Sequence, residues 1–150
     1  MKKKSDWLDD IQEQQQLKYR FAGKVEEREI ETFEKEYGLT LPADYRAFIQ
    51  RLGCGSIGHF EIFGLGVKPV GIPSLPWLLN DLKALDVMPP AEILPVSPLG
   101  DGTYAAVLHK PKGAFCKGTV VRWTPNSKSA RLEVLGSSFS SYLLSLITGR

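Results

Sequence analysis

The sequence predicts an α+β domain with helices first, strands in the middle and a last helix at the end. Three observations support this fold class. Apolar residues recur at helical spacing near both ends, β-branched and aromatic runs separated by turn residues lie between them, and strands do not alternate with helices. A chain of 150 residues can bury one sizeable core, and no linker or repeat divides it. We therefore expect residues 1–150 to form a single domain.

Two helices are expected before residue 40. Residues 5–21 carry a narrow apolar stripe that begins at Trp7, which suits a polar helix with Ser5 as its N-cap. Residues 26–37 carry a second apolar face. Gly38 fits the left-handed position just past the end of that helix.

A third helix is expected to begin with Pro42 in its first turn, where the missing N–H of proline would be unpaired anyway. Its apolar face continues to Leu52. The glycines between residues 53 and 58 predict a flexible loop, and residues 60–65 predict a buried strand.

Residues 67–76 contain three prolines and predict a loop. Residues 77–85 predict a short helix with Leu78, Leu82 and Leu85 on its apolar side.

The rest of the chain predicts an antiparallel meander followed by a helix. The apolar runs at 60–63, 93–96, 104–108, 119–123 and 131–135 give about five strands, with a turn at 100–102. Residues 137–147 place apolar side chains at helical spacing, and this closing helix should cover one face of the sheet.

Composition argues against several classes of protein. No apolar run reaches the roughly 18 residues of a membrane helix, and the lysines at 2–4 do not precede an apolar segment, so we expect a cytoplasmic protein. Cys54 and Cys116 lie at no metal-ligand spacing, so neither a metal nor a cofactor is expected. The net charge of +2 does not favour nucleic acid, although residues 6–44 hold 11 acidic and 5 basic side chains.

A helix-turn-helix motif carries a resemblance to a known family. Residues 29–49 follow the pattern I-x-x-F-E, then a glycine, then L-P-x-D-Y-x-x-F-I, with a glycine-containing loop and an apolar strand after it. The chain thereby resembles the SUKH superfamily of Smi/Knr-like proteins. The positions that carry this resemblance are Trp7, Ile30, Phe33, Gly38, Leu41, Pro42, Tyr45, Phe48, Gly64, Gly100, Asp101 and Phe139.

The resemblance implies a single twisted antiparallel sheet flanked by helices. It also implies a partner, because many bacterial members bind and neutralise polymorphic toxins, often nucleases or nucleic-acid deaminases. Fungal relatives act as hubs of cell-wall assembly, so a housekeeping interaction module is the alternative. Neither branch is known as an enzyme. Most of the motif residues are expected in the core or in turns rather than at a site.

Two pairs of residues allow a catalytic interpretation as well as a structural one. Cys54 precedes His59 by five residues, but a nucleophilic cysteine also needs an orienting group and an oxyanion hole, which nothing in the sequence indicates. Glu61 and Asp101 would serve as an acid-base pair only if the fold brought them together, and Asp101 better fits a turn. The glycines of residues 53–66 follow a helix and lack the lysine of a phosphate loop.

Two charged segments remain. Residues 110–131 hold 6 basic and no acidic side chains, which suits either single-stranded nucleic acid or, as we prefer, a solvated strand edge. Residues 26–36 form an acidic helix that can cover the cationic surface of a nuclease. The residues expected to contact a toxin partner are Glu29, Glu31, Glu34 and Glu36, with Gly55, Ser56 and His59 in the loop.

Overall fold

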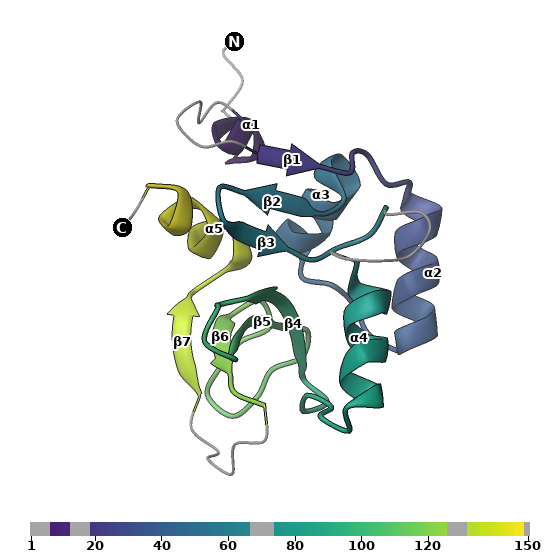
Figure 1. Cartoon of the computed structure of the whole chain (residues 1–150), viewed down its shortest axis with the longest axis vertical. Helices are drawn as coiled ribbons and strands as arrows, with labels where there is room; N and C mark the ends of the chain where they lie inside the picture. The colour runs from purple at the N-terminus through teal and green to yellow at the C-terminus, as the bar shows by residue number, and fades with distance from the viewer. Residues whose placement is uncertain (1–6, 13–18, 67–73, 126–131, 149–150) are drawn as a thin grey trace.

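The computed structural model of the chain describes residues 7–12, 19–66, 74–125 and 132–148. The helices are α1 (Trp7–Gln12), α2 (Glu27–Tyr37), α3 (Ala43–Leu52), α4 (Leu75–Ala84) and α5 (Phe139–Thr148). The strands are β1 (Tyr19–Phe21), β2 (Gly55–Ile57), β3 (Phe60–Ile62), β4 (Ile93–Pro98), β5 (Tyr104–Leu108), β6 (Val120–Trp123) and β7 (Glu133–Gly136). Figure 1 shows this arrangement, which confirms the predicted α+β class.

The strands form two antiparallel sheets, so the prediction of one sheet of about five strands is wrong. The smaller sheet has the order β1-β2-β3 and the larger one the order β4-β5-β6-β7. Strands β1 and β2 were not expected, because each has only three residues and neither shows an alternating pattern long enough to recognise. The segment predicted as a flexible glycine loop therefore contains a strand.

The two sheets are joined at an irregularity in β4. The pairing of β4 with β5 shifts between Pro95 and Ser97, which leaves Val96 outside the regular ladder. The carbonyl of Val96 instead accepts a hydrogen bond from the Phe63 N–H at 2.7 Å, just past β3. The hydroxyl of Ser97 donates to the Glu61 carbonyl at 2.5 Å. The bulge thus provides the groups that link the larger sheet to the smaller one.

The predicted N-terminal helix over residues 5–21 is partly wrong. Helix α1 ends at Gln12, and residues 19–21 form β1, which pairs with β2. This pairing requires Gly55, because a Cβ atom there would lie 1.9 Å from the Arg20 carbonyl oxygen. Long-range pairing therefore overrides a locally helical pattern. Ser5, the expected N-cap, lies outside the described residues.

The α2–α3 hairpin largely follows the sequence prediction. Gly38 ends α2 with φ 65° and ψ 39°, the left-handed conformation that glycine adopts most easily. Pro42 has φ −56° but ψ 144°, so it is the cap residue directly before α3 rather than part of its first turn. The prediction is therefore wrong by one position at Pro42 and confirmed at Gly38.

The motif residues Asp44 and Tyr45 connect α3 to the rest of the fold. Tyr45 is fully buried, and its hydroxyl donates a hydrogen bond to the Phe63 carbonyl, the residue that also joins the sheets. One carboxylate oxygen of Asp44 accepts the Ser140 N–H at 2.8 Å, in the first turn of α5. An oxygen acceptor at a helix start satisfies backbone donors that the helix itself leaves unpaired.

Aromatic rings fill the space between α3 and α5. The Phe139 ring lies 4.7 Å from Tyr45 and 5.4 Å from Phe48, and Trp7 of α1 packs edge-on against Phe139 at 6.0 Å. Edge-to-face and tilted pairs at these distances are the arrangements that aromatic rings favour. The motif positions in the core are buried as expected: Ile30, Phe33, Leu41, Tyr45, Phe48 and Phe139.

The later elements match their predictions except at some ends. Helix α4 begins at Leu75, two residues before the predicted start, because the Ser74 hydroxyl caps the Trp77 N–H at 3.2 Å. Leu85, expected on the apolar side of this helix, lies past its end and is 65% exposed. Strands β4 to β7 and helix α5 lie where the sequence places them, within a few residues.

Replacing Tyr45 with phenylalanine should destabilise the protein by about 1–3 kcal/mol, because the buried Phe63 carbonyl loses a hydrogen-bond donor while the ring keeps its packing. Urea unfolding followed by circular dichroism measures this change. Tyr37→Phe is the matched control, because the half-buried Tyr37 hydroxyl has no hydrogen bond with any residue that the structure describes. An equal loss in both variants would contradict the assigned role of Tyr45.

Candidate partner-binding surfaces

The glutamates of α2 divide into those bound within the chain and those facing solvent. Arg46 of α3 contacts Glu27 at 2.5 Å and Glu34 at 3.4 Å. Glu34 also accepts the Leu41 N–H at 2.8 Å, across the turn that joins the two helices. The hydrogen bond from Arg46 lowers the pKa of Glu27 below its usual value and keeps it ionised. These two glutamates hold α2 against α3.

The outward-facing part of α2 is therefore narrower than the sequence suggested. Glu31 and Glu36 are exposed, and Glu29 is half-buried with an interaction of its own. Of the four glutamates expected to contact a partner, Glu34 has a structural role in the α2–α3 turn. Glu31 and Glu36 remain the best placed for a charged contact.

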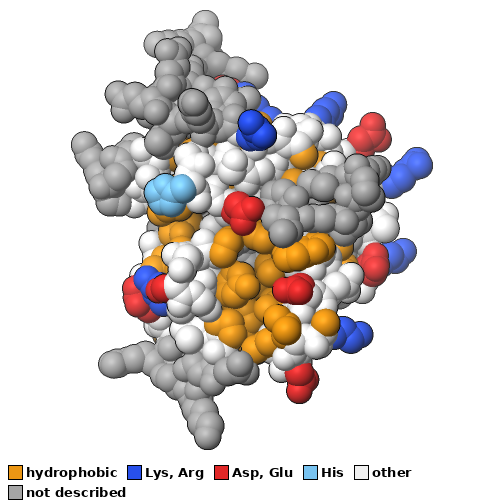
Figure 2. Space-filling view, in the orientation of Figure 1, with side chains coloured by type: hydrophobic (Ala, Val, Ile, Leu, Met, Phe, Trp, Pro, Cys, Tyr) orange, Lys and Arg blue, Asp and Glu red, His pale blue; other side chains and the backbone are white. Residues whose placement is uncertain are grey.

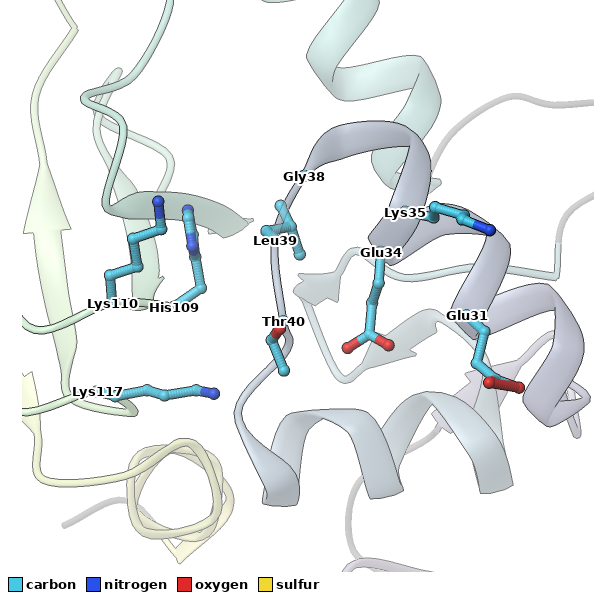
Figure 3. Close-up of a pocket in the computed structure, with 9 residues that line it drawn as sticks. All are labelled: Glu31, Glu34, Lys35, Gly38, Leu39, Thr40, His109, Lys110 and Lys117. Carbon is cyan, nitrogen blue, oxygen red and sulfur yellow. The ribbon is translucent and has the colours of Figure 1, made fainter.

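A cleft of about 570 Å³ lies between the end of α2 and the loop after β5 (Figure 3). Lysines from both sides line it, and Figure 3 shows the Lys117 side chain extending toward Thr40. His109 also lines the cleft and is only 7% exposed. Its pKa is lowered, first by burial and then by the positive charge of Lys110.

Sequence reasoning missed this cleft because its two walls are about 70 residues apart along the chain. The lining residues are Glu31, Glu34, Lys35, Gly38, Leu39, Thr40, His109, Lys110 and Lys117.

The three residues expected in a contact loop lie on the β2–β3 hairpin. Gly55 and Ser56 belong to β2 and are half-buried, so they are held by strand pairing rather than in a loop. His59 is exposed at the turn, and its ring lies 4.1 Å from the ring of Phe60. A cavity of about 300 Å³, lined in part by Gly55, Ser56 and Glu61, lies beside these strands.

The surroundings of Cys54 disfavour a nucleophilic role. The residue is buried, and burial raises the pKa of its thiol to about 11. A reactive cysteine requires the opposite shift, because the thiolate is the nucleophile. At neutral pH Cys54 is a protonated thiol, whereas His59 is exposed at the hairpin turn.

Asp101 shapes the turn before β5, as the sequence predicts. It accepts hydrogen bonds from the Thr103 N–H at 3.0 Å and the Thr103 hydroxyl at 2.5 Å. These bonds lower its pKa, and Arg122 lies 3.4 Å from its second oxygen. Glu61, the other half of the imagined acid-base pair, lines the cavity beside β2 instead. Each carboxylate thus has its own surroundings.

The basic stretch is partly neutralised within the fold. Lys112 pairs with Glu92 at 3.1 Å, and Arg122 pairs with Asp101 and with Glu133 at 3.3 Å. The lysines at 110 and 117 line the cleft described above. Lys128 and Arg131 lie outside the described residues. This distribution does not form a continuous basic track within the parts of the chain that the structure describes.

Among the described residues, no three His, Cys, Asp or Glu side chains come together as metal ligands. In the same parts of the chain, every helix is too short or too polar to cross a membrane.

The structure is an α+β fold with two antiparallel sheets, and α2 carries exposed glutamates. The chain belongs to the SMI1/KNR4 family (SUKH-1), since the model of this family matches residues 24–145. This match confirms the resemblance found in the sequence. Among curated proteins, none matches the chain.

A solved structure has a similar fold. It is the crystal structure of a protein from Pseudomonas syringae pv. tomato, with a TM-score of 0.67 and 18% sequence identity. The similarity covers 93% of this chain and 95% of that one. At 18% identity, this similarity shows only that the two chains share a fold.

Cys54 should react with a thiol reagent such as Ellman's reagent far more slowly than the exposed Cys116 at pH 7–8. A pKa of about 11, against the usual 9.0, lowers the thiolate fraction about a hundredfold, and burial adds a steric barrier. Absorbance traces should show two phases, a fast reaction of Cys116 and a slow reaction of Cys54. Cys116→Ser should remove the fast phase, and urea should abolish the difference. A fast reaction in that variant would contradict the burial of Cys54.

Proposed function

We propose that this chain is an immunity protein that binds a cognate polymorphic toxin, a nuclease or a nucleic-acid deaminase, in the cytoplasm. Membership of the SMI1/KNR4 (SUKH-1) family is the observation that carries the proposal. The immunity protein would block the toxin by occupying its active site or the route by which substrate reaches that site. No catalytic step is assigned to the immunity protein itself.

The charge on α2 supports this proposal. Toxins that act on nucleic acids display cationic groups for phosphates, and a carboxylate face can cover such groups. Glu31 and Glu36 point outward from a helix whose other side is anchored by Arg46. Opposite charges on two partners speed their encounter and help to select the right one.

Co-expression tests the proposal directly. The toxin encoded beside this chain should lose its toxicity when both are made in one cell, and the two proteins should co-purify. A toxin that remains fully active and elutes separately would refute the proposal. A housekeeping module, the alternative, would instead be found without a neighbouring toxin gene.

Charge reversal at Glu31 should slow association with the toxin by about tenfold at low salt and weaken its salt dependence. Surface plasmon resonance at several salt concentrations measures both effects. Glu133→Lys is the control, because it reverses a largely exposed glutamate on β7 instead of α2, and its ion pair with Arg122 is a surface pair that contributes little to folding. If Glu31→Lys and the control associate at the same rate, Glu31 is not part of the contact.

A further inference from the structure

Hydrophobic side chains gather on part of the face shown in Figure 2, in the region of α4 and the adjoining strands of the larger sheet. Part of it is a row across three strands, because Pro98 pairs with Tyr104 and Tyr104 pairs with Trp123. Residues directly opposite each other in a sheet point to the same side. The rings of Tyr104 and Trp123 lie 5.5 Å apart. Tyr104 is half-buried, so part of this row reaches the surface.

Helix α4 continues this area away from the strands. Trp77, Asp81 and Leu85 are spaced four residues apart, which places them along one side of the helix and its end. Trp77 is half-buried against Phe63, with ring centroids 6.4 Å apart, whereas Leu85 is 65% exposed.

The segment after α4 connects the helix to the strand row. Met88 is 55% exposed, and it shares with Trp123 a cavity of about 330 Å³. We name the whole area the α4 apolar surface, and its residues are Trp77, Leu85, Met88, Pro98 and Tyr104, with the buried ring of Trp123 beside Tyr104.

One carboxylate lies within this apolar surface. Asp81 is half-buried on α4 and close to Tyr104, whose pKa is raised by burial and, secondarily, by the negative charge of Asp81. The Asp81 carboxylate forms no hydrogen bond or ion pair with any other residue in the described ranges. Figure 2 shows acidic side chains set among the hydrophobic ones on this face. A half-buried carboxylate beside an aromatic ring can bind a cation, which pairs with the carboxylate and packs against the ring.

We infer that the α4 apolar surface is the docking site for the toxin, and that an arginine or lysine of the toxin, flanked by apolar side chains, binds Asp81. The inference rests on the proposed function and names the surface that performs it. Tryptophan, tyrosine and methionine are enriched at the centres of protein interfaces, where a few residues provide most of the binding energy. The cation would pair with Asp81 while its stem packs on Trp77 or Tyr104.

The exposed glutamates of α2 and the α4 apolar surface would then have different roles in binding. Exposed charges such as Glu31 act over a distance and change mainly the rate of association. A desolvated pair at Asp81 and apolar contacts at Leu85 hold the complex together and therefore control its dissociation.

The test uses Asp81→Asn, which removes the charge but keeps the shape, and Leu85→Ser, which removes an exposed apolar side chain at little expected cost to folding. The toxin domain encoded beside this chain is immobilised, and dissociation rates are measured by surface plasmon resonance. Each variant should dissociate about tenfold faster or more. Val134→Ser is the matched control for Leu85, since Val134 is 49% exposed on β7, at the edge of the larger sheet away from α4 (Figure 1).

The outcomes separate this inference from the proposed function. If the wild type binds the toxin and both variants dissociate at its rate, the docking site is elsewhere and the proposed function stands. If the wild type does not bind, both are refuted. If sedimentation shows a wild-type dimer that Leu85→Ser dissociates while toxin binding is unchanged, the surface joins two copies of this chain, and the inference is overturned.

Discussion

The fold depends on what Asp44 and Tyr45 bind. These neighbours in α3 reach two distant segments: Tyr45 donates to the Phe63 carbonyl where the sheets meet, and Asp44 accepts the Ser140 N–H at the start of α5. A buried carbonyl without its donor costs free energy comparable to a lost hydrogen bond. The short helix α3 thus fixes the sheet junction and the closing helix together. Asp44 and Tyr45 of the L-P-x-D-Y motif therefore have structural roles in this fold.

Charge is allocated along α2 by the same hairpin. Arg46 forms ion pairs with Glu27 and Glu34, and these pairs hold α2 and α3 together. Glu31 and Glu36 face solvent instead. Exposed ion pairs contribute little to stability on their own, but Glu34 also accepts a backbone N–H from the α2–α3 turn and is therefore a structural residue. The acidic appearance of the sequence overstates the acidity of the face that a partner would meet.

Elements with a local sequence pattern could be predicted from the sequence. Strands that form only by pairing with segments far away in the chain could not. Gly38 and helix α2 followed from periodicity and a left-handed glycine. Strands β1 and β2 are three residues each and exist because they pair with one another, so no local pattern announces them. The link between the two sheets runs through the bulge at Val96, which no sequence period encodes. The α4 apolar surface escaped prediction for a related reason, since its residues come from a helix, a connecting segment and three strands.

The close approach of Gly55 to the Arg20 carbonyl bears on how such a protein can diversify. A side chain at this position would separate β1 from β2, so change here would cost part of the smaller sheet. Ser56 and His59 sit on the same hairpin without that restriction, and His59 is exposed. Substitutions at Ser56 and His59 can therefore change the surface of the hairpin. Gly55 cannot change in the same way, because a side chain there would collide with the Arg20 carbonyl.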